Sequence, residues 1–270
     1  MPRARNAATA EMEQSEGYLA SVSDLMAALI FVFILTVAVF ALRLAETVEE
    51  LTDSRQARAD IVLTLAEKIK SVVAIEVAPE HGVLHIREAD EDGTHQGISF
   101  PVGRADPTPQ SGKAIGALAH ALAEVLPCYV SGSQSDAQRV HARRPQHCGA
   151  LVQPEPCEDK DASKVDTLLI EGHTDKQPFV DRMSGVDHNL DLSSQRAAAV
   201  FREMTACQPV LEQFANTSER RILGVSGYGA YRQEFESDDK NRRIDLRFMM
   251  ELPEARGAND VIRDVQQAEE

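Results

Sequence analysis

An uninterrupted apolar segment near the N-terminus constrains this chain more than any other feature of its sequence. From Leu25 to Leu42 every residue is apolar except Thr36. A helix of this length rises about 27 Å, which is close to the hydrocarbon thickness of a bilayer. We therefore expect a transmembrane helix over residues 19–44, preceded by a short cytoplasmic tail over residues 1–18.

A cleaved signal peptide is the alternative interpretation of this segment. It would need a basic leader, a shorter apolar run and small residues before the cleavage site. The leader holds Arg3 and Arg5 but also three glutamates, so an uncleaved anchor is the better interpretation. The orientation of the span is indicated more weakly. Arg3 and Arg5 precede the span and only Arg43 follows it closely, so the positive-inside rule gives a weak preference for a cytoplasmic N-terminus. The sequence thus predicts a single-pass inner-membrane protein whose C-terminal domain lies in the periplasm.

Charge and cysteine content exclude some functions and suggest a compartment. The formal net charge is -15, which argues against binding a phosphate backbone and hence against a nucleic-acid partner. Four cysteines follow the apolar segment, namely Cys128, Cys148, Cys157 and Cys207. An even number there is compatible with two disulfides in an oxidising periplasm, and buried free thiols are the alternative. Together with His141 and His147, two of these cysteines match no common zinc module, so we expect no metal and no cofactor.

A helical linker is expected over residues 45–72. Its apolar residues recur at alternating spacings of four and three: Leu44, Val48, Leu51, Val62, Leu65, Ile69 and Val72. Such a seam suits a short parallel helix pair, weakened in the middle by Arg55 and Arg58. A monomeric amphipathic helix that packs on the following domain fits the same pattern.

Beyond the linker, period-two patterning predicts a domain over residues 73–252. Strands are expected over 73–77 and 83–87, joined by a turn at Pro79–Gly82, and further strands over 166–172, 221–226 and 243–250. Helices are expected over 113–126 and 192–204. This alternation predicts an α/β sandwich with helices on one face of a mixed sheet. A polar loop is inserted over residues 131–163, and an acidic tail occupies residues 253–270.

Four motifs in this domain carry a family resemblance. They are Ile170-Glu-Gly-His-Thr-Asp175, Asn189-Leu-Asp-Leu-Ser-Ser-Gln-Arg-Ala197, Gly227-Tyr-Gly229 and Asn241-Arg-Arg-Ile244. In this order they closely resemble the OmpA-like peptidoglycan-binding family, and the upstream segment 99–105 resembles the family's first strand. The resemblance covers roughly residues 98–251. It implies a groove that holds the diaminopimelate side chain of the peptide stem.

The resemblance also implies which residues bind. The peptidoglycan-binding set is Thr174, Asp175, Asn189, Leu192, Arg196, Arg242 and Arg243. Diaminopimelate ends in an ammonium and a carboxylate on one carbon, so its recognition needs an acid and a base held apart. Asp175 would take the ammonium and Arg196 the carboxylate. Thr174 and Asn189 would add neutral hydrogen bonds, and backbone donors near Leu192 would complete the site.

Other positions in these motifs have structural interpretations. Of Arg242 and Arg243, one is expected to brace the groove and the other to face outward. His173 is expected to tie its loop, and Ser193 to cap the N-terminus of its helix. The loop 176–188 is longer than in outer-membrane members of the family and similar to that of motor stators. No Ser/His/Asp arrangement, metal-ligand set or phosphate loop is present in the sequence, so we do not expect an enzyme.

Asp24 is the one ionisable residue at the N-terminal edge of the apolar segment. Burying a carboxylate within a membrane costs several kcal/mol of free energy, so such a residue is by default functional. The alternative is an interfacial aspartate whose side chain snorkels to the cytoplasm. Small residues around it would let other helices approach closely. An aspartate at the start of a lone membrane helix, followed by this domain, resembles stator subunits of the MotB type. These include flagellar MotB and its relative ZorB of the Zorya anti-phage defence system.

This second resemblance implies a function and partners. Asp24 would carry ions, most simply protons, while two copies of the chain sit within a ring of a MotA/ZorA-type membrane partner. The absence of tryptophan and the short acidic N-terminal tail favour the defence protein over the flagellar one. A passive anchor between membrane and cell wall is the alternative from another class, and it would have no need of Asp24.

The fold implied by the resemblance also suggests a disulfide pairing. Cys128 and Cys207 each follow a predicted helix, and the two helices would lie side by side with adjacent C-terminal ends. We therefore expect Cys128 to pair with Cys207, and Cys148 to pair with Cys157 across the inserted loop. Four cysteines allow three pairings, and this one requires the least rearrangement of the expected fold.

Overall fold

The computed structural model describes residues 3–89, 93–133, 144–153, 164–177 and 188–251, with side chains from Ser23 onward apart from residue 50. The chain divides into two compact units, residues 1–51 and residues 52–270. Helix α1 (Arg3–Ile69) runs through the first unit and into the second.

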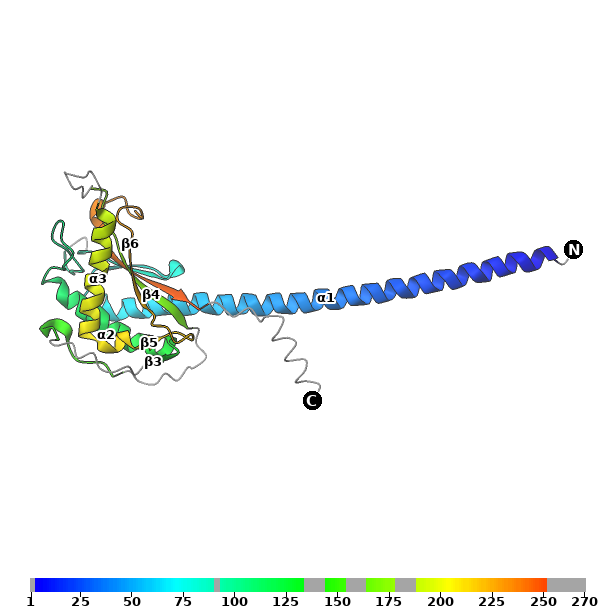
Figure 1. The fold of residues 1–270 in the computed structure, drawn as a ribbon, viewed down its shortest axis with the longest axis horizontal. Coiled ribbons are helices and arrows are strands. Elements are labelled where there is room, and N and C mark those ends of the chain that lie inside the picture. The colour runs from blue at the N-terminus through cyan, green and yellow to red at the C-terminus, as the bar shows by residue number, and fades with distance from the viewer. Residues whose placement is uncertain (1–2, 90–92, 134–143, 154–163, 178–187, 252–270) are drawn as a thin grey trace. The chain divides into compact units, whose positions relative to one another are not determined.

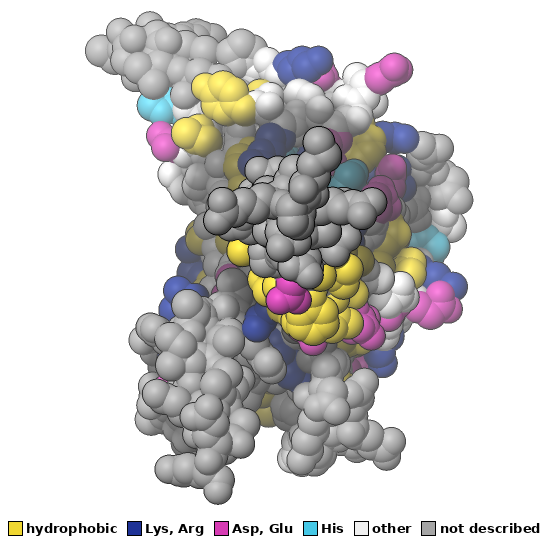
Figure 2. Space-filling model, turned by 90° about the vertical axis from the view of Figure 1, so that its right-hand side faces the viewer, with side chains coloured by type: hydrophobic (Ala, Val, Ile, Leu, Met, Phe, Trp, Pro, Cys, Tyr) yellow, Lys and Arg dark blue, Asp and Glu magenta, His cyan; other side chains and the backbone are white. Residues whose placement is uncertain are grey.

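The first unit is the apolar part of α1. Within the described residues, α1 is the one helix long and apolar enough to cross a membrane. Its hydrophobic side chains are exposed, and a cluster of them is visible on the surface in Figure 2. The hydroxyl of Thr36 donates to the carbonyl of Val32 at 2.8 Å. The single polar side chain inside the apolar run is therefore satisfied by the helix itself, as an apolar solvent requires.

The second unit is built on a five-stranded sheet of order β1-β2-β7-β4-β6. Its strands are β1 (Ile75–Ala78), β2 (Val83–Ile86), β4 (Val165–Gly172), β6 (Leu223–Gly227) and β7 (Ile244–Met250). Strands β4 and β6 are parallel and the other neighbours are antiparallel, so the sheet is mixed. Strands β3 (Gly132–Ser133) and β5 (Phe214–Ala215) form a separate small sheet.

Two helices cover one face of this sheet, which confirms the predicted α/β sandwich. Helix α3 (Asn189–Cys207) packs against β4 and β6, and α2 (Ser111–Val125) packs against α3 (Figure 1). Short helical turns complete the described elements: η1 (Pro79–His81), η2 (Leu126–Tyr129), η3 (Gln146–Cys148), η4 (Pro209–Glu212) and α4 (Asp238–Asn241).

The predicted linker divides into two parts with different surroundings. Ile61, Val62, Leu65 and Ile69 are buried in the core of the second unit. Further back along α1, Leu44, Val48 and Leu51 are exposed. The later part of the linker therefore packs on the domain, as the second alternative for the heptad pattern requires. The core begins at Ile61, before the predicted domain start at residue 73.

The predicted disulfide pairing is wrong. Cys148 is bonded to Cys207, with their Cα atoms 4.8 Å apart. Cys128 is also disulfide-bonded, and Cys157 lies outside the described residues. The predicted pairs Cys128–Cys207 and Cys148–Cys157 therefore do not form, because each would need a cysteine already used in the Cys148–Cys207 bond.

The physical reason is the path of the inserted segment. Residues 144–152 fold back over α2 and the end of α3 instead of closing on themselves. The side-chain amide of Gln208 donates to the Ala150 carbonyl at 2.7 Å and accepts from the Val152 amide at 3.0 Å. A Cβ at Gly116 would lie only 2.8 Å from the His147 carbonyl, so glycine permits this close approach. The bridge thus fastens the insertion to the helical layer.

Candidate functional site

A cavity of about 370 Å³ lies where β4 ends and α3 begins. Six of the seven residues predicted to bind peptidoglycan line it: Thr174, Asp175, Asn189, Leu192, Arg196 and Arg242. We call it the charged pocket, defined by the acid Asp175 and the base Arg196. Glu88, Phe100, Val102, Gly103 and Gln177 complete its lining.

The acid of the charged pocket is held by the turn that follows β4. The backbone amides of His173 and Thr174 donate to the carbonyls of Arg243 and Gly229, at 3.1 and 3.0 Å. These bonds fix the chain just before Asp175. The Asp175 carboxylate then accepts the Gln177 amide at 3.0 Å through one oxygen, and its side chain is 13% exposed. The carboxylate is therefore positioned by backbone contacts and still reaches the cavity.

The base of the charged pocket stands on the first half of α3. Arg196 is only 5% exposed, its Nε donates to the Arg104 carbonyl at 3.1 Å, and its guanidinium lies 4.8 Å from the centre of the Phe100 ring. Burial lowers the pKa of Arg196, while the carboxylates of Glu88 and Asp175 act in the opposite direction. The terminal nitrogens of Arg196 have no acceptor among the described residues. They are available to an anionic ligand.

The neutral groups of the charged pocket differ in what they offer. The Thr174 hydroxyl is buried without a hydrogen-bond partner among the described residues, which is costly unless a ligand supplies one. The Asn189 side chain donates to the Gln177 carbonyl at 2.9 Å and so closes one wall. The expected backbone donor at Leu192 is already used, because its amide donates to the His188 carbonyl at 2.9 Å. Leu192 contributes an apolar wall instead.

Arg242 braces the acidic side of the charged pocket. Its Nη1 is 3.0 Å from the Asp175 carboxylate, and its Nη2 is 3.4 Å from Glu88 and 2.5 Å from Asp239. Burial alone would lower the pKa of Arg242, but the hydrogen bonds to Asp239 and Asp175 raise it above its usual value. Arg242 is therefore a fixed cation whose donors are occupied by carboxylates.

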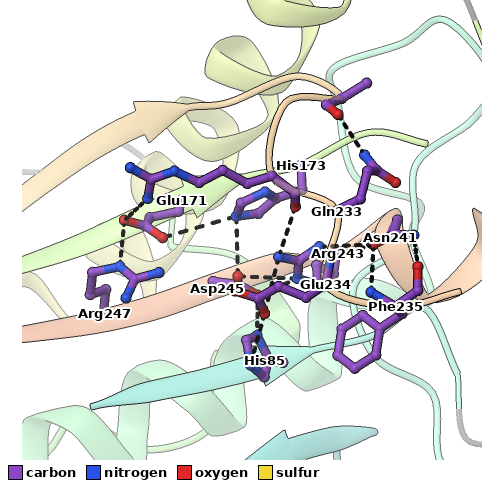
Figure 3. Close-up of polar contacts among 12 residues, drawn as sticks. His85, Glu171, His173, Gln233, Glu234, Phe235, Asn241, Arg243, Asp245 and Arg247 are labelled. Atoms are coloured by element: carbon purple, nitrogen blue, oxygen red, sulfur yellow. Dashed lines mark hydrogen bonds and ion pairs between the residues drawn. The ribbon is translucent and has the colours of Figure 1, made fainter. Parts of the chain in front are cut away.

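Arg243 is not in the charged pocket and does not face outward. Only 1% of it is exposed, and its Nε donates to Asp245 at 3.0 Å. Asp245 is also 2.9 Å from His85 Nδ1 and 3.1 Å from His173 Nε2, so three basic side chains converge on one buried carboxylate (Figure 3). Burial alone would raise the pKa of Asp245, but the contacts with His173 and His85 hold it well below its ordinary value. We call these four residues the Asp245 cluster.

A second buried acid lies beside the Asp245 cluster. Glu171 is fully buried, accepts from Arg247 Nε at 2.8 Å and from the Tyr228 hydroxyl at 3.3 Å. His173 thus has the structural role that the resemblance implies. Since His173 precedes Asp175 by two residues and Arg243 follows Arg242, the cluster fixes two of the chain segments that supply the charged pocket. Buried charges held in such a network are costly to disrupt singly.

The start of α3 also differs from the prediction. The helix begins at Asn189, so Ser193 lies inside it and does not cap it. Its hydroxyl accepts the Gly229 amide at 2.8 Å and donates to the Leu190 carbonyl at 2.8 Å. Ser193 therefore ties α3 to the turn after β6. Gly229 has a φ of +53°, a conformation that L side chains rarely adopt.

Glu88 is the pocket residue that the sequence did not reveal. It is the second residue after β2, outside the four motifs, in a segment of several acidic residues that resembles an ordinary solvated turn. The signal that could have identified it is its position at the end of a strand, next to the start of β7 in an antiparallel pair. Phe100, Val102 and Arg104 lie in the segment 99–105, for which the resemblance implies the family's first strand, whereas the structure has no strand over these residues.

Asp24, the predicted ion-carrying residue, lies in the first unit. It is exposed on α1, together with Ser23, Ala27 and Ala28. It is the one ionisable residue between Ser23 and Leu42. A wide surface of small and apolar side chains therefore surrounds a single carboxylate.

No protein-family model and no curated protein matches this chain. Among solved structures, it is similar to the cell wall anchor of the T6SS from Pseudomonas aeruginosa, with 19% identity over 71% of this chain and 97% of that chain and a TM-score of 0.38. A putative MotB-like protein from Desulfovibrio vulgaris is 16% identical over 76% of this chain and 99% of that chain, with a TM-score of 0.42. The periplasmic domain of Helicobacter pylori MotB is 14% identical over 69% and 82%, with a TM-score of 0.35.

Proposed function

We propose that this chain is the cell-wall-binding subunit of an ion-driven stator, held in the inner membrane by α1. Its charged pocket binds the zwitterionic end of a diaminopimelate side chain in peptidoglycan. One observation carries the binding role: Asp175 and Arg196 line the same cavity, together with a buried Thr174 hydroxyl that has no hydrogen-bond partner among the described residues.

The chemistry of the pocket suits a group with both charges on one carbon. The free terminal nitrogens of Arg196 can take a carboxylate through two parallel hydrogen bonds. Asp175 can accept an ammonium, because each carboxylate oxygen accepts more than one hydrogen bond. Thr174 offers a further hydroxyl. A lysine side chain would bring only the ammonium and leave Arg196 buried without an anion, so it is disfavoured.

The binding role is tested by co-sedimentation of the detergent-solubilised full chain with isolated peptidoglycan sacculi. Asp175→Asn and Arg196→Gln are each expected to weaken binding by at least tenfold, because each leaves one ligand charge unpaired in the pocket, a loss of about 2–5 kcal/mol. Arg220→Gln is the matched control, since Arg220 is an exposed arginine (73% for the side chain) outside the charged pocket. Wild-type sedimentation by both pocket variants would contradict the proposal.

The ion-driven part of the proposal is supported by Asp24. Placing a carboxylate at the edge of a membrane span costs free energy, and a protein that only anchors the membrane to the cell wall would not need one. We propose that Asp24 carries protons, and that two copies of the chain work within a ring of a MotA/ZorA-type partner. Moving one proton through 100 mV yields about 2.3 kcal/mol, so several protons are needed for each costly mechanical step.

Between the two stator types, we favour the Zorya anti-phage system over flagellar motility. The chain has no tryptophan, and the inserted segment is fastened by the Cys148–Cys207 bridge. A neighbouring gene for a membrane partner with a long cytoplasmic coiled tail, together with a nuclease or helicase gene, would support the defence function. A flagellar gene cluster around this one would contradict it.

A further inference from the structure

Glu88 is fixed at the charged pocket by backbone contacts. The amide of Gly97 donates to the Glu88 carbonyl at 2.8 Å, and the amide of Ile98 donates to the Arg87 carbonyl at 3.0 Å. A Cβ at Gly97 would lie only 1.7 Å from the Arg87 carbonyl oxygen, so this pairing needs glycine. The carboxylate of Glu88 is 27% exposed and lines the same cavity as Asp175 and Arg196.

The carboxylates that contact Arg242 carry more negative charge than its guanidinium carries positive charge. Three carboxylates, those of Asp175, Glu88 and Asp239, contact the single guanidinium of Arg242. One positive charge therefore faces three negative ones. In the same cavity, the terminal nitrogens of Arg196 meet no acceptor among the residues that the structure describes. The carboxylates thus retain uncompensated negative charge, and Arg196 retains donors for an anion. A zwitterionic ligand would complement both.

An ammonium carries three N–H donors and needs several acceptors when it leaves water. Asp175 cannot supply all of these acceptors, since one of its oxygens already accepts the Gln177 amide and the other accepts Arg242. We infer that Glu88 is a second carboxylate for the ligand, so that the ammonium of diaminopimelate is bound between Asp175 and Glu88 while Arg196 holds the carboxylate. This inference rests on the proposed binding of peptidoglycan and extends it to the residue that selects a free amine.

A purely structural role for Glu88 makes a different prediction. If Glu88 only held Arg242 in place, its removal would weaken every ligand equally. If it binds the ammonium, its removal weakens only ligands whose amine is free. Asp239 provides the matched control, because its carboxylate also contacts Arg242 but does not line the charged pocket, and its side chain is 81% exposed.

The test uses the full chain in detergent and two synthetic peptides. One is L-Ala-γ-D-Glu-meso-diaminopimelate, and the other is the same tripeptide acetylated on the free diaminopimelate amine. Binding is followed through ligand NMR signals, which detect weak complexes. Glu88→Gln is expected to weaken the free-amine peptide about tenfold, as expected for one lost charge-assisted hydrogen bond, and to leave the acetylated peptide unchanged. Asp239→Asn is expected to keep the preference of the wild type.

Equal weakening of both peptides by Glu88→Gln, or no weakening of either, would overturn the inference while leaving the proposed function intact. Failure of the wild-type chain to bind either peptide would instead overturn the proposed function, and this inference with it. Melting temperatures of both variants show whether the fold is retained.

Discussion

Asp245 is a buried carboxylate on which several neighbouring side chains of the second unit depend. It lies among His85, His173 and Arg243, and no part of it is exposed. Because Arg243 is buried and contacts only Asp245 and the partly exposed Glu234 among the described carboxylates, removing the Asp245 charge would leave a buried guanidinium poorly compensated. The charged pocket depends on this cluster, since Asp175 and Arg242 are carried by the same two chain segments.

Asp245→Asn is therefore expected to destabilise the folded domain by about 3–5 kcal/mol. The folded-state pKa of Asp245 is depressed, so its contribution to stability is fully present at neutral pH and is lost as pH falls below the ordinary aspartate range of about 3.9. Thermal unfolding of the detergent-solubilised chain at pH 7 and at acidic pH measures both effects. An unchanged melting temperature at pH 7, or an unchanged acid dependence in the variant, would contradict this role.

Asp24 is the residue on which the ion-driven function depends. Asp24→Asn is expected to abolish that function while leaving membrane insertion and sedimentation with sacculi unchanged, because asparagine has a similar shape but cannot cycle a proton. Phage protection, or motility if the chain is flagellar, is measured in cells that carry the partner genes. Asp24→Glu is the control and should retain part of the activity. Full activity of the asparagine variant would exclude ion transport by this residue.

At the scale of elements, local patterns predicted the strands and helices closely. The strand over 166–172 and the helix over 113–126 match β4 and α2 because their periodicity follows from which face is buried. The start of α3 was placed three residues late, because Asn189 begins the helix without a capping side chain. The linker pattern could not show where packing begins, since the same spacing fits a partner helix and a neighbouring domain.

The charged pocket was partly predictable for a similar reason. Motif positions identify Asp175 and Arg196 because binding chemistry fixes both the residue type and its place after a strand or on a helix. The motif gives a wrong prediction for Arg243. Of its two adjacent arginines, Arg242 lies in the pocket and Arg243 lies in the core. Glu88 lies outside every motif, and only the three-dimensional pairing of β2 with β7 brings it to Arg242.

The disulfides could not be predicted because they depend on the path of the inserted segment, which has no period. Peptide mapping of the non-reduced protein is expected to find Cys148 linked to Cys207. With four cysteines in the chain, the expected second linked pair is Cys128 with Cys157. A Cys128–Cys207 peptide, or four thiols that react with an alkylating reagent in protein from the periplasm, would contradict the described arrangement.

For the whole molecule, the proposed function joins two tasks in one chain. In the first unit Asp24 lies at the start of the apolar segment of α1, and the second unit carries a pocket with an acid and a base. A stator needs both, because force on a moving partner requires a fixed attachment to the cell wall. The two tasks can be separated experimentally. Pocket variants should no longer bind the cell wall but should still insert into the membrane. The Asp24 variant should do both and lose only the ion-driven activity.

The binding of a zwitterionic side chain is the central claim, and calorimetry tests it directly. The detergent-solubilised full chain is titrated with L-Ala-γ-D-Glu-meso-diaminopimelate and with the same tripeptide carrying L-lysine in place of diaminopimelate. We predict saturable binding of the diaminopimelate peptide and at least tenfold weaker binding of the lysine peptide, because lysine leaves Arg196 without its carboxylate. Equal affinity for the two peptides, or no binding of the diaminopimelate peptide, would contradict it.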